Sequence, residues 1–268
     1  MRQIFPECGD PLGPADPLRA AGPITQGDAA AEELAAAVAD IYRYPDRPWV
    51  KANFVVSIDG AISADGKSAG LSGAADRLVF TVLRSLADVV VAGAGTVRAE
   101  RYRQAQPGEL WQRLRAGRPP APPIAVVTRR LELDLSARLF GSGPGLARTI
   151  VLTSELAEQD RVAAAARVAD VVVAGAETVT AKAIVDALAA RGYRRILVEG
   201  GPMLLGQLVA EGMLDELCLT LSPVIEGGHA TGRLTTRRGP TAPAAMALAT
   251  LLEDDGFLLS RYVRAAPA

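Results

Sequence analysis

The chain has too few cysteines and histidines for a disulfide framework or a histidine-based metal centre. Its 268 residues contain two widely separated cysteines, Cys8 and Cys218, and one histidine, His229. Two lone thiols make neither a disulfide framework nor a zinc motif. One histidine cannot build a metal cluster within one chain, and any Ser-His-Asp triad would need that residue. We therefore expect no metal site, and we interpret Cys218, in an apolar run, as a buried small hydrophobe.

The chain also lacks an excess of charge of either sign. Its formal net charge is −1 and its pI is about 6.0, so no global electrostatic feature favours nucleic acid or a membrane surface as a partner. No uncharged window is long enough to span a membrane, and the first residues contain no long apolar stretch. We expect a cytoplasmic protein that binds neither nucleic acid nor membranes.

Hydrophobic residues, by contrast, make up 49% of the chain, which is ample for one large core or two small ones. Residues 1–27 are rich in Pro, Gly and Asp and predict an irregular arm. A helix is predicted over Asp28–Tyr44, where Asp28 can cap an alanine-rich segment. No change of composition divides the later residues. The prediction is an N-terminal arm and helix over residues 1–48 and a single domain over residues 49–268.

Short apolar segments alternate with helical patterns through this domain, which predicts an α/β fold with a mostly parallel central sheet flanked by helices. The predicted strands are Trp49–Asp59, Asp88–Gly95, Pro122–Thr128, Arg148–Ser154, Asp170–Ala176, Arg194–Gly201, Asp215–Gly228 and Gly256–Ala265. The predicted helices are Ala74–Ala87, Thr180–Gly192 and Pro202–Gly212. Because no helix separates the last two strands, we predict an antiparallel C-terminal edge. We interpret Tyr102–Pro123 as a mobile loop.

Three glycine turns follow predicted strands: Gly93–Thr96, Gly175–Thr178 and Glu199–Pro202. Glycine lets the backbone approach a phosphate closely, and a following helix offers free N–H groups and the positive end of its dipole. The G-x-G-x-x-G fingerprint and the P-loop are both missing. Each turn alone is as compatible with plain chain reversal, but the three together predict a nucleotide site.

Two of these turns belong to nearly identical segments. Ala87–Val97 and Ala169–Val179 differ at a single position. Both are typical of a buried strand that leads into a glycine turn. We predict that both turns lie at the carboxyl edge of the sheet, where open α/β sheets bind their ligands.

A strand that ends in Thr128, Arg129 and Arg130 adds a hydroxyl and two guanidinium groups to this edge. Arginine binds phosphate through two parallel hydrogen bonds. We predict that these residues bind the 2′-phosphate of NADP, although a solvated basic turn would have the same sequence.

Polar residues also recur along the first strand of the domain. Lys51, Asn53, Ser57 and Asp59 share one face at strand spacing. Such a face is costly to bury unless it lines a polar site. An edge strand facing water is the alternative, but the intervening apolar residues and the glycine-rich turn favour a site.

Three stretches, "VSIDGAIS", "LRSLADVVVAGAGTVRAE" and "ILVEGGPMLLGQLVAEGMLDELCLTLSPVIEGG", resemble the RibD C-terminal family. These are the pyrimidine reductase domains of bacterial riboflavin biosynthesis, and their fold is similar to that of dihydrofolate reductase. The resemblance covers roughly Trp49–Arg264. It implies an NADPH-dependent reduction in which hydride reaches C1′ of the imine tautomer of a phosphorylated ribosylaminopyrimidine, giving a ribitylamine. It also implies a homodimer formed through strands near the C-terminus.

The residues and the resemblance together predict the site. The predicted catalytic residues are Asp59 and Glu199. The predicted substrate-binding residues are Lys51, Asn53, Ser57, Leu71, Ser72 and Glu100. The predicted cofactor-binding residues are Gly93, Ala94, Gly95, Thr96, Thr128, Arg129, Arg130, Gly175, Gly200, Gly201, Pro202, Met203 and Leu204. The family usually has aspartate where this chain has Glu100.

The sequence departs from the bifunctional family members in lacking the zinc deaminase motifs His-x-Glu and Pro-Cys-x-x-Cys. The arginines that bind the substrate phosphate have no fixed match, and Arg77, Arg98, Arg101 and Arg103 are candidates by position. A changed substrate such as dihydrofolate or another pteridine is therefore a second hypothesis. A dinucleotide-binding regulator without catalysis is a third.

Overall fold

The computed structural model describes residues 1–5, 29–106, 108–141, 143, 146–227, 234–235 and 243–265. Its strands are β1 (Arg2–Phe5), β2 (Trp49–Ser57), β3 (Val89–Gly93), β4 (Ile124–Val127), β5 (Thr149–Thr153), β6 (Ala169–Val173), β7 (Arg195–Gly200), β8 (Glu216–Ser222), β9 (Met246–Asp254) and β10 (Phe257–Arg264). Its α-helices are α1 (Ala29–Ile41), α2 (Ala74–Leu86), α3 (Ala94–Ala99), α4 (Glu109–Leu114), α5 (Gln159–Val168), α6 (Ala181–Ala189) and α7 (Pro202–Ala210), and its 3₁₀ turns are η1 (Ser68–Leu71) and η2 (Arg138–Phe140).

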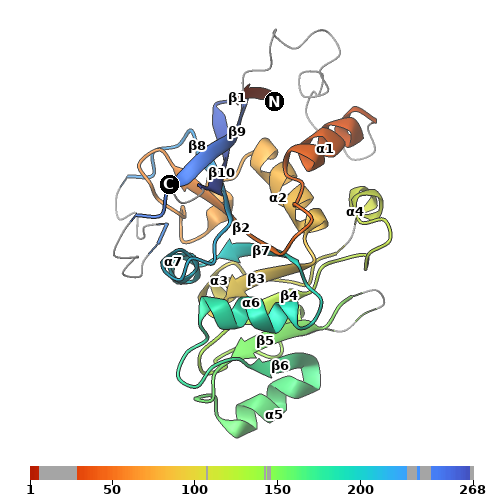
Figure 1. The fold of residues 1–268 in the computed structure, drawn as a ribbon, viewed down its shortest axis with the longest axis vertical. Helices are drawn as coiled ribbons and strands as arrows, with labels where there is room; N and C mark the ends of the chain where they lie inside the picture. The colour runs from red at the N-terminus through yellow and green to blue at the C-terminus, as the bar shows by residue number, and fades with distance from the viewer. Residues whose placement is uncertain are drawn as a thin grey trace.

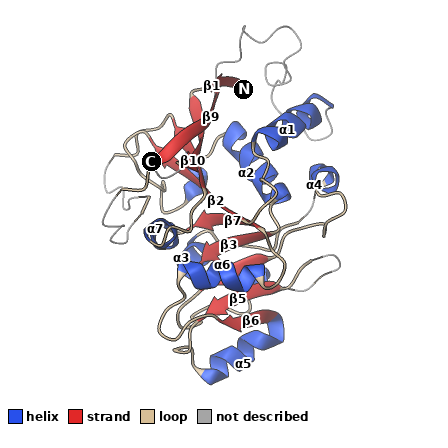
Figure 2. Cartoon of the chain, viewed as in Figure 1, coloured by secondary structure: helices blue, strands red, loops and turns tan. Residues whose placement is uncertain are grey.

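One ten-stranded sheet runs through the molecule in the order β1-β9-β10-β8-β2-β7-β3-β4-β5-β6 (Figure 1). Every neighbouring pair from β8 to β6 is parallel. The strands β1, β9 and β10 pair antiparallel with one another, and β10 pairs antiparallel with β8 (Figure 2). The predicted fold class, a mostly parallel central sheet with an antiparallel C-terminal edge, is confirmed.

Helices cover both faces of the parallel part of the sheet. Buried side chains of α1, α2 and α5 pack in one apolar cluster, and those of α6 and α7 pack in a second cluster on the opposite face. A sheet buried on both sides requires strands that are apolar on both faces, as the runs at β3 and β5 are. Within the described ranges, none of the helices combines the length and apolar character needed to cross a bilayer.

The antiparallel edge contains two strands that the sequence did not predict. Residues 2–5, expected to be irregular, form β1 and pair with β9. The strand β9 itself was overlooked, although it pairs along its length with β10. The rest of the predicted arm, with Cys8, and the loop histidine His229 lie outside the described residues.

The prediction of a mobile loop over Tyr102–Pro123 is wrong for part of this segment, which packs against the core. It contains α4, which contacts α1 and α2. Trp111 of α4 is 5% exposed and belongs to the main apolar cluster. Arg115 is also buried, and its guanidinium donates to the carbonyl oxygens of Ser85 and Ala87 at 3.0 and 2.6 Å. These contacts anchor the segment.

Lys51, predicted to bind substrate, lies in the core instead. Its side chain is 0% exposed, and its Nζ lies 3.0 Å from Oε1 of Glu216. Arg261 and Trp49 donate to the same carboxylate at 2.7 and 2.8 Å. Burial would raise the pKa of Glu216, but Lys51 and Arg261 together hold that pKa below its ordinary value. Lys51 therefore neutralises a buried acid between β2 and β8 and is not among the described residues that line the large cavity.

The exchange Lys51→Met should lower the free energy of unfolding by about 3 kcal/mol or more, because it leaves a buried acid with one cation fewer. Urea unfolding measures the loss. The matched control is Lys182→Met, which removes an exposed lysine paired with Asp186 and should cost at most about 0.5 kcal/mol. Equal losses in the two variants would show that the buried ion pair contributes no more to the free energy of unfolding than the exposed pair.

Candidate active site

The carboxyl ends of β3 and β7 bring two predicted glycine turns together. The two strands are neighbours, so the turn after β3 faces the turn after β7. A Cβ atom added to Gly200 would lie 2.6 Å from Cγ2 of Thr96, and one added to Gly201 would lie 2.7 Å from Oγ1 of Thr96. The peptide bond between Gly200 and Gly201 is cis. Glycine is required here because the Thr96 side chain fills the space of a Cβ atom.

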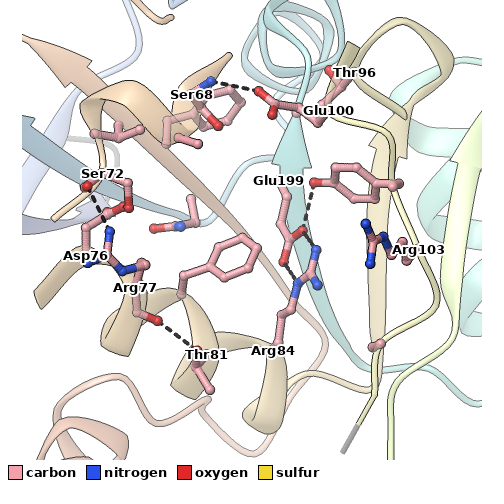
Figure 3. A pocket seen from close by; sticks show the side chains of 18 of the residues that line it. Ser68, Ser72, Asp76, Arg77, Thr81, Arg84, Thr96, Glu100, Arg103 and Glu199 are labelled. Carbon is pink, nitrogen blue, oxygen red and sulfur yellow. Dashed lines mark hydrogen bonds and ion pairs between the residues drawn. The ribbon is translucent and has the colours of Figure 1, made fainter. Parts of the chain in front are cut away.

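A cavity of about 1590 Å³ opens beside these turns. Its other walls come from the middle of β2, from η1, from the face of α2 and from the segment that follows α3 (Figure 3). The predicted site residues that line it are Asn53, Ser72, Thr96, Glu100, Glu199, Gly200, Gly201 and Pro202. The structure thus brings part of the predicted cofactor site and part of the predicted substrate site to one cavity.

Glu199 lies at the inner wall of this cavity, where three donors occupy its carboxylate (Figure 3). Arg84 from the end of α2 donates to both oxygens, through Nε and Nη2, each at 2.6 Å. The Tyr102 hydroxyl donates to Oε2 at 2.9 Å. The guanidinium of Arg84 also stacks on the ring of Phe80, 4.3 Å from its centroid. One carboxylate therefore joins β7, α2 and the segment after α3.

The electrostatics of this cluster keep its two donors protonated. Burial would lower the pKa of Arg84, but the adjacent Glu199 carboxylate raises it above the ordinary value. Burial, followed by the same carboxylate, raises the pKa of Tyr102 well above its ordinary value. Because Arg84 stays charged and Tyr102 stays a phenol at neutral pH, Glu199 acts here as an acceptor of hydrogen bonds.

Two buried acceptors of residues that line the cavity have no partner among the described residues, one on β2 beside β7 and one across the cavity on α2. They are Oδ1 of Asn53 on β2 and Oδ1 of Asp76 in the first turn of α2. The second oxygen of Asp76, Oδ2, accepts a hydrogen bond from the Ser72 hydroxyl at 2.5 Å. An unpaired buried acceptor costs about 1–3 kcal/mol. A ligand that brings N–H donors into the cavity would remove that cost.

Asp59, predicted to be catalytic, holds a turn outside the set of residues that line the cavity. Its carboxylate accepts hydrogen bonds from the Ser57 hydroxyl and from the backbone N–H groups of Glu226 and Gly227. These hydrogen bonds, with Ser57 the largest cause, lower the pKa of Asp59 to about 2. A carboxylate that stays ionised at neutral pH cannot donate a proton, so the structure argues against the predicted role.

Ser57 and Leu71 were predicted to bind substrate, and both are buried away from the cavity lining. Ser57 is 0% exposed, and its Oγ accepts from the N–H of Ala61 at 2.8 Å, so it stabilises the turn after β2. Leu71 is 1% exposed and packs at the end of η1. As with Lys51, the side chains of Ser57 and Leu71 stabilise the fold and are not part of the cavity lining.

Farther along the same edge, the predicted 2′-phosphate residues lie at the end of β4. Arg129 and Arg130 are exposed. Thr128 is buried, and its Oγ1 accepts from the N–H of Leu131 at 3.1 Å. Arg129 donates through Nε to the carbonyl oxygen of Glu177 at 2.9 Å, which links the turn after β4 to the turn after β6. Both repeated segments thus end at one sheet edge, as predicted.

Among the other predicted cofactor residues, the structure separates backbone positions from side-chain positions. Gly93, Ala94 and Gly95 form the passage from β3 into α3, and a Cβ atom added to Gly95 would meet no other atom within 4 Å. In α7, Met203 is 71% exposed, whereas Leu204 is 6% exposed and packs in the core. Glycine is needed at position 175 for a local reason, because an added Cβ atom would lie 2.1 Å from the carbonyl oxygen of Thr178.

The candidate phosphate-binding arginines divide into two groups. Exposed Arg77, Arg101 and Arg103 line the cavity. Arg98 instead borders a smaller neighbouring cavity and donates to the carbonyl oxygen of Glu132 at 2.9 Å. Glu100 also has a local partner, because its Oε1 accepts from the N–H of Ser68 at 2.8 Å.

Sequence reasoning missed Asp76, Arg84 and Tyr102. Asp76 is an acid in the first turn of a helix, where acids are common, and Tyr102 lies at the start of the predicted mobile loop. Arg84 offered a usable signal, because it is a charge near the end of an amphipathic helix, just before a predicted buried strand. Among the described residues no group of three or more His, Cys, Asp or Glu side chains could hold a metal ion.

The sequence and the fold are similar to those of known proteins. The family model of the RibD C-terminal domain matches residues 48–256. A relative from Archaeoglobus fulgidus, named 2,5-diamino-6-ribosylamino-4(3H)-pyrimidinone 5′-phosphate reductase, is 34% identical over 186 residues, which are 68% of this chain and 84% of the relative.

Two solved structures share the fold. A pyrimidine reductase-like protein from Corynebacterium diphtheriae superposes with a TM-score of 0.74 and 28% identity, covering 82% of this chain and 93% of its own. A Thermotoga maritima protein, named a diaminohydroxyphosphoribosylaminopyrimidine deaminase/5-amino-6-(5-phosphoribosylamino)uracil reductase, has a TM-score of 0.59 and 22% identity over 82% of this chain and 57% of its own.

The contact between Gly200 and Thr96 leads to a stability prediction. Gly200→Ala should lower the free energy of unfolding by about 1–3 kcal/mol, because a β-branched threonine has few rotamers with which to make room. In a Thr96→Ala background the same exchange should cost clearly less. Thermal unfolding of the four proteins measures both effects. As a control, Gly95→Ala should stabilise by up to about 1 kcal/mol, since open space surrounds that position within a helix.

Proposed function

The chain belongs to the RibD C-terminal domain family, and from this membership we propose that it reduces a phosphorylated ribosylaminopyrimidine with NADPH, turning the ribosyl group into a ribityl chain. The observation that supports this best is the composition of the large cavity. The glycine turns after β3 and β7 form one part of its wall, and Asn53 on β2 and Asp76 on α2 add polar acceptors that have no partner among the described residues. A cofactor and a polar ring can therefore meet there.

The residues at the sheet edge fit a dinucleotide. Gly200 and Gly201 precede α7, a helix whose first turn has no side-chain cap, so its free N–H groups and positive dipole end suit a pyrophosphate. Arg129 and Arg130 lie two strand intervals from β7, about 10 Å along the edge, where they can bind a 2′-phosphate. We expect NADPH to extend along the edge with its nicotinamide end in the cavity.

When bound, NADPH would supply the hydride for C1′ of the open-chain imine, and one proton taken from solvent by the imine nitrogen completes the reduction to the ribitylamine. The chain's own residues must orient the imine and favour its protonated, cationic state. Glu199 provides negative charge at the inner wall, between the glycine turn and the ring side of the cavity. Its carboxylate oxygens accept all three hydrogen bonds, so we assign Glu199 a positioning and electrostatic role.

The substrate phosphate needs cations at the cavity mouth. Arg77, Arg101 and Arg103 are exposed there and form no ion pair within the described part of the chain. Arg77 already donates to the carbonyl oxygen of Ser72 at 3.1 Å, which directs its guanidinium toward the entrance turn. We assign the phosphate to this group of arginines.

The homodimer and the cytoplasmic location remain predictions. Large apolar side chains are exposed just beyond the carboxyl ends of β2 and β8, where Ile58 is 56% and Ile225 is 72% exposed. Such side chains are compatible with burial against a second copy of the chain.

The function is tested by titrating the protein with NADPH and then following NADPH absorbance with each substrate. We expect NADPH to bind and to be oxidised with the phosphorylated ribosylaminopyrimidine but not with dihydrofolate. Turnover of dihydrofolate alone would favour a pteridine reductase. Binding without turnover of either compound would favour a regulator, and failure to bind NADPH would refute all three hypotheses.

Glu199→Gln should reduce kcat by about 100-fold or more, because the amide removes the negative charge beside the imine. The dissociation constant for NADPH should change much less, since Gly200 and Gly201 bind it through their backbone. Steady-state kinetics and a fluorescence titration measure the two quantities. Equal losses in turnover and in binding would show that Glu199 only supports the fold.

A further inference from the structure

Asp76 lines the cavity and carries a buried, unused acceptor. The residue is 6% exposed, and its Oδ1 has no hydrogen-bond partner among the described residues, while Oδ2 accepts from the Ser72 hydroxyl. Figure 3 shows Asp76 on the side of the cavity opposite the Glu199–Arg84 pair. A buried carboxylate oxygen can only accept, so it selects a ligand atom that carries a hydrogen.

The names of the relatives describe two pyrimidines that differ in this property. The Archaeoglobus fulgidus reductase is named for a 2,5-diamino pyrimidinone, which carries an amino group at ring carbon C2. The Thermotoga maritima protein is named for a uracil, which carries a carbonyl oxygen at C2. The amino group donates hydrogen bonds, whereas the carbonyl oxygen only accepts them.

Two acceptors of this cavity could meet that edge of the ring, and they differ in adaptability. The amide of Asn53 can turn and present either its oxygen or its nitrogen, so it tolerates both pyrimidines. Asp76 cannot adapt in this way, because both of its side-chain polar atoms are oxygens. A C2 carbonyl in place of the amino group would set a second acceptor against Oδ1, and such a mismatch of buried polar groups disfavours the wrong substrate.

We propose that Asp76 is a specificity-determining residue that accepts a hydrogen bond from the C2 amino group and so selects the 2-amino pyrimidine over its deaminated, uracil-type counterpart. This inference rests on the proposed function and names the form of substrate within it.

The test compares kcat/KM for the two phosphorylated pyrimidines, one with a C2 amino group and one with a C2 carbonyl. We expect the wild-type protein to prefer the 2-amino form by about 100-fold or more. Asp76→Asn should narrow this ratio by about tenfold or more. Ser72 can keep donating to the remaining oxygen, so the amide nitrogen of the variant takes the place of Oδ1 and donates to a carbonyl.

The matched control is Asp160→Asn, which makes the same exchange in the first turn of α5, on an exposed residue remote from the cavity lining. It should leave the ratio unchanged, although it also removes an acid from a helix N-terminus. The substrate preference of the wild-type protein is measured without any variant, so the proposal can still be tested if the Asp76→Asn protein folds poorly.

The outcomes separate this inference from the proposed function. Similar turnover of both pyrimidines by the wild type, or a preference for the uracil form, would overturn the role of Asp76 and leave the reductase function standing. Equal slowing of both substrates by Asp76→Asn would also overturn it, because a purely structural residue would behave in that way. Turnover of neither pyrimidine, with NADPH bound, would refute the proposed function and this inference with it.

Discussion

The bidentate ion pair between Arg84 and Glu199 is the interaction on which the rest of the site depends. It joins the end of α2 to the end of β7 inside the protein, where either charge alone would be strongly unfavourable. Tyr102 donates to the same carboxylate and so fixes the segment after α3. Gly200 and Gly201 follow Glu199 directly, so the proposed cofactor turn takes its position from this pair. Three elements of the cavity wall are therefore joined by the carboxylate of Glu199.

Charged and polar groups on β2 show how a single strand face can serve two purposes. Lys51 and Asn53 point to the same side, two residues apart, yet Lys51 neutralises Glu216 in the core and Asn53 lines the cavity. Strand periodicity defines the face of a residue but says nothing about its depth. Depth depends on which segments cover that part of the strand, and here the segment after α1 covers Lys51, whose Nζ donates to the backbone oxygen of Tyr42 at 2.6 Å and lies over the ring of Tyr44.

Much of the fold could be predicted because apolar runs and helical periods were strong. The parallel strands and the helices α2, α6 and α7 were found within a few residues. The elements that were missed had weaker local signals. Helix α5 is rich in alanine and charge and has little apolar periodicity, and the segment of α4 is surrounded by proline and glycine, so that only the burial of Trp111 reveals its anchoring. The strand β9 depends on its pairing with β10.

The sequence by itself determined the parallel sheet, its glycine-bearing edge and the family motifs, because these follow from apolar runs and from turns that admit no side chain. The tertiary structure decided which element of secondary structure follows each of those turns. Two nearly identical segments lead into α3 after β3, a central strand, but only into bends after β6, the last strand of the sheet. Tertiary structure also decided which acids face the cavity. Asp59 accepts from Glu226 and Gly227, which are distant in the chain, whereas Asp76 keeps one acceptor without a partner among the described residues.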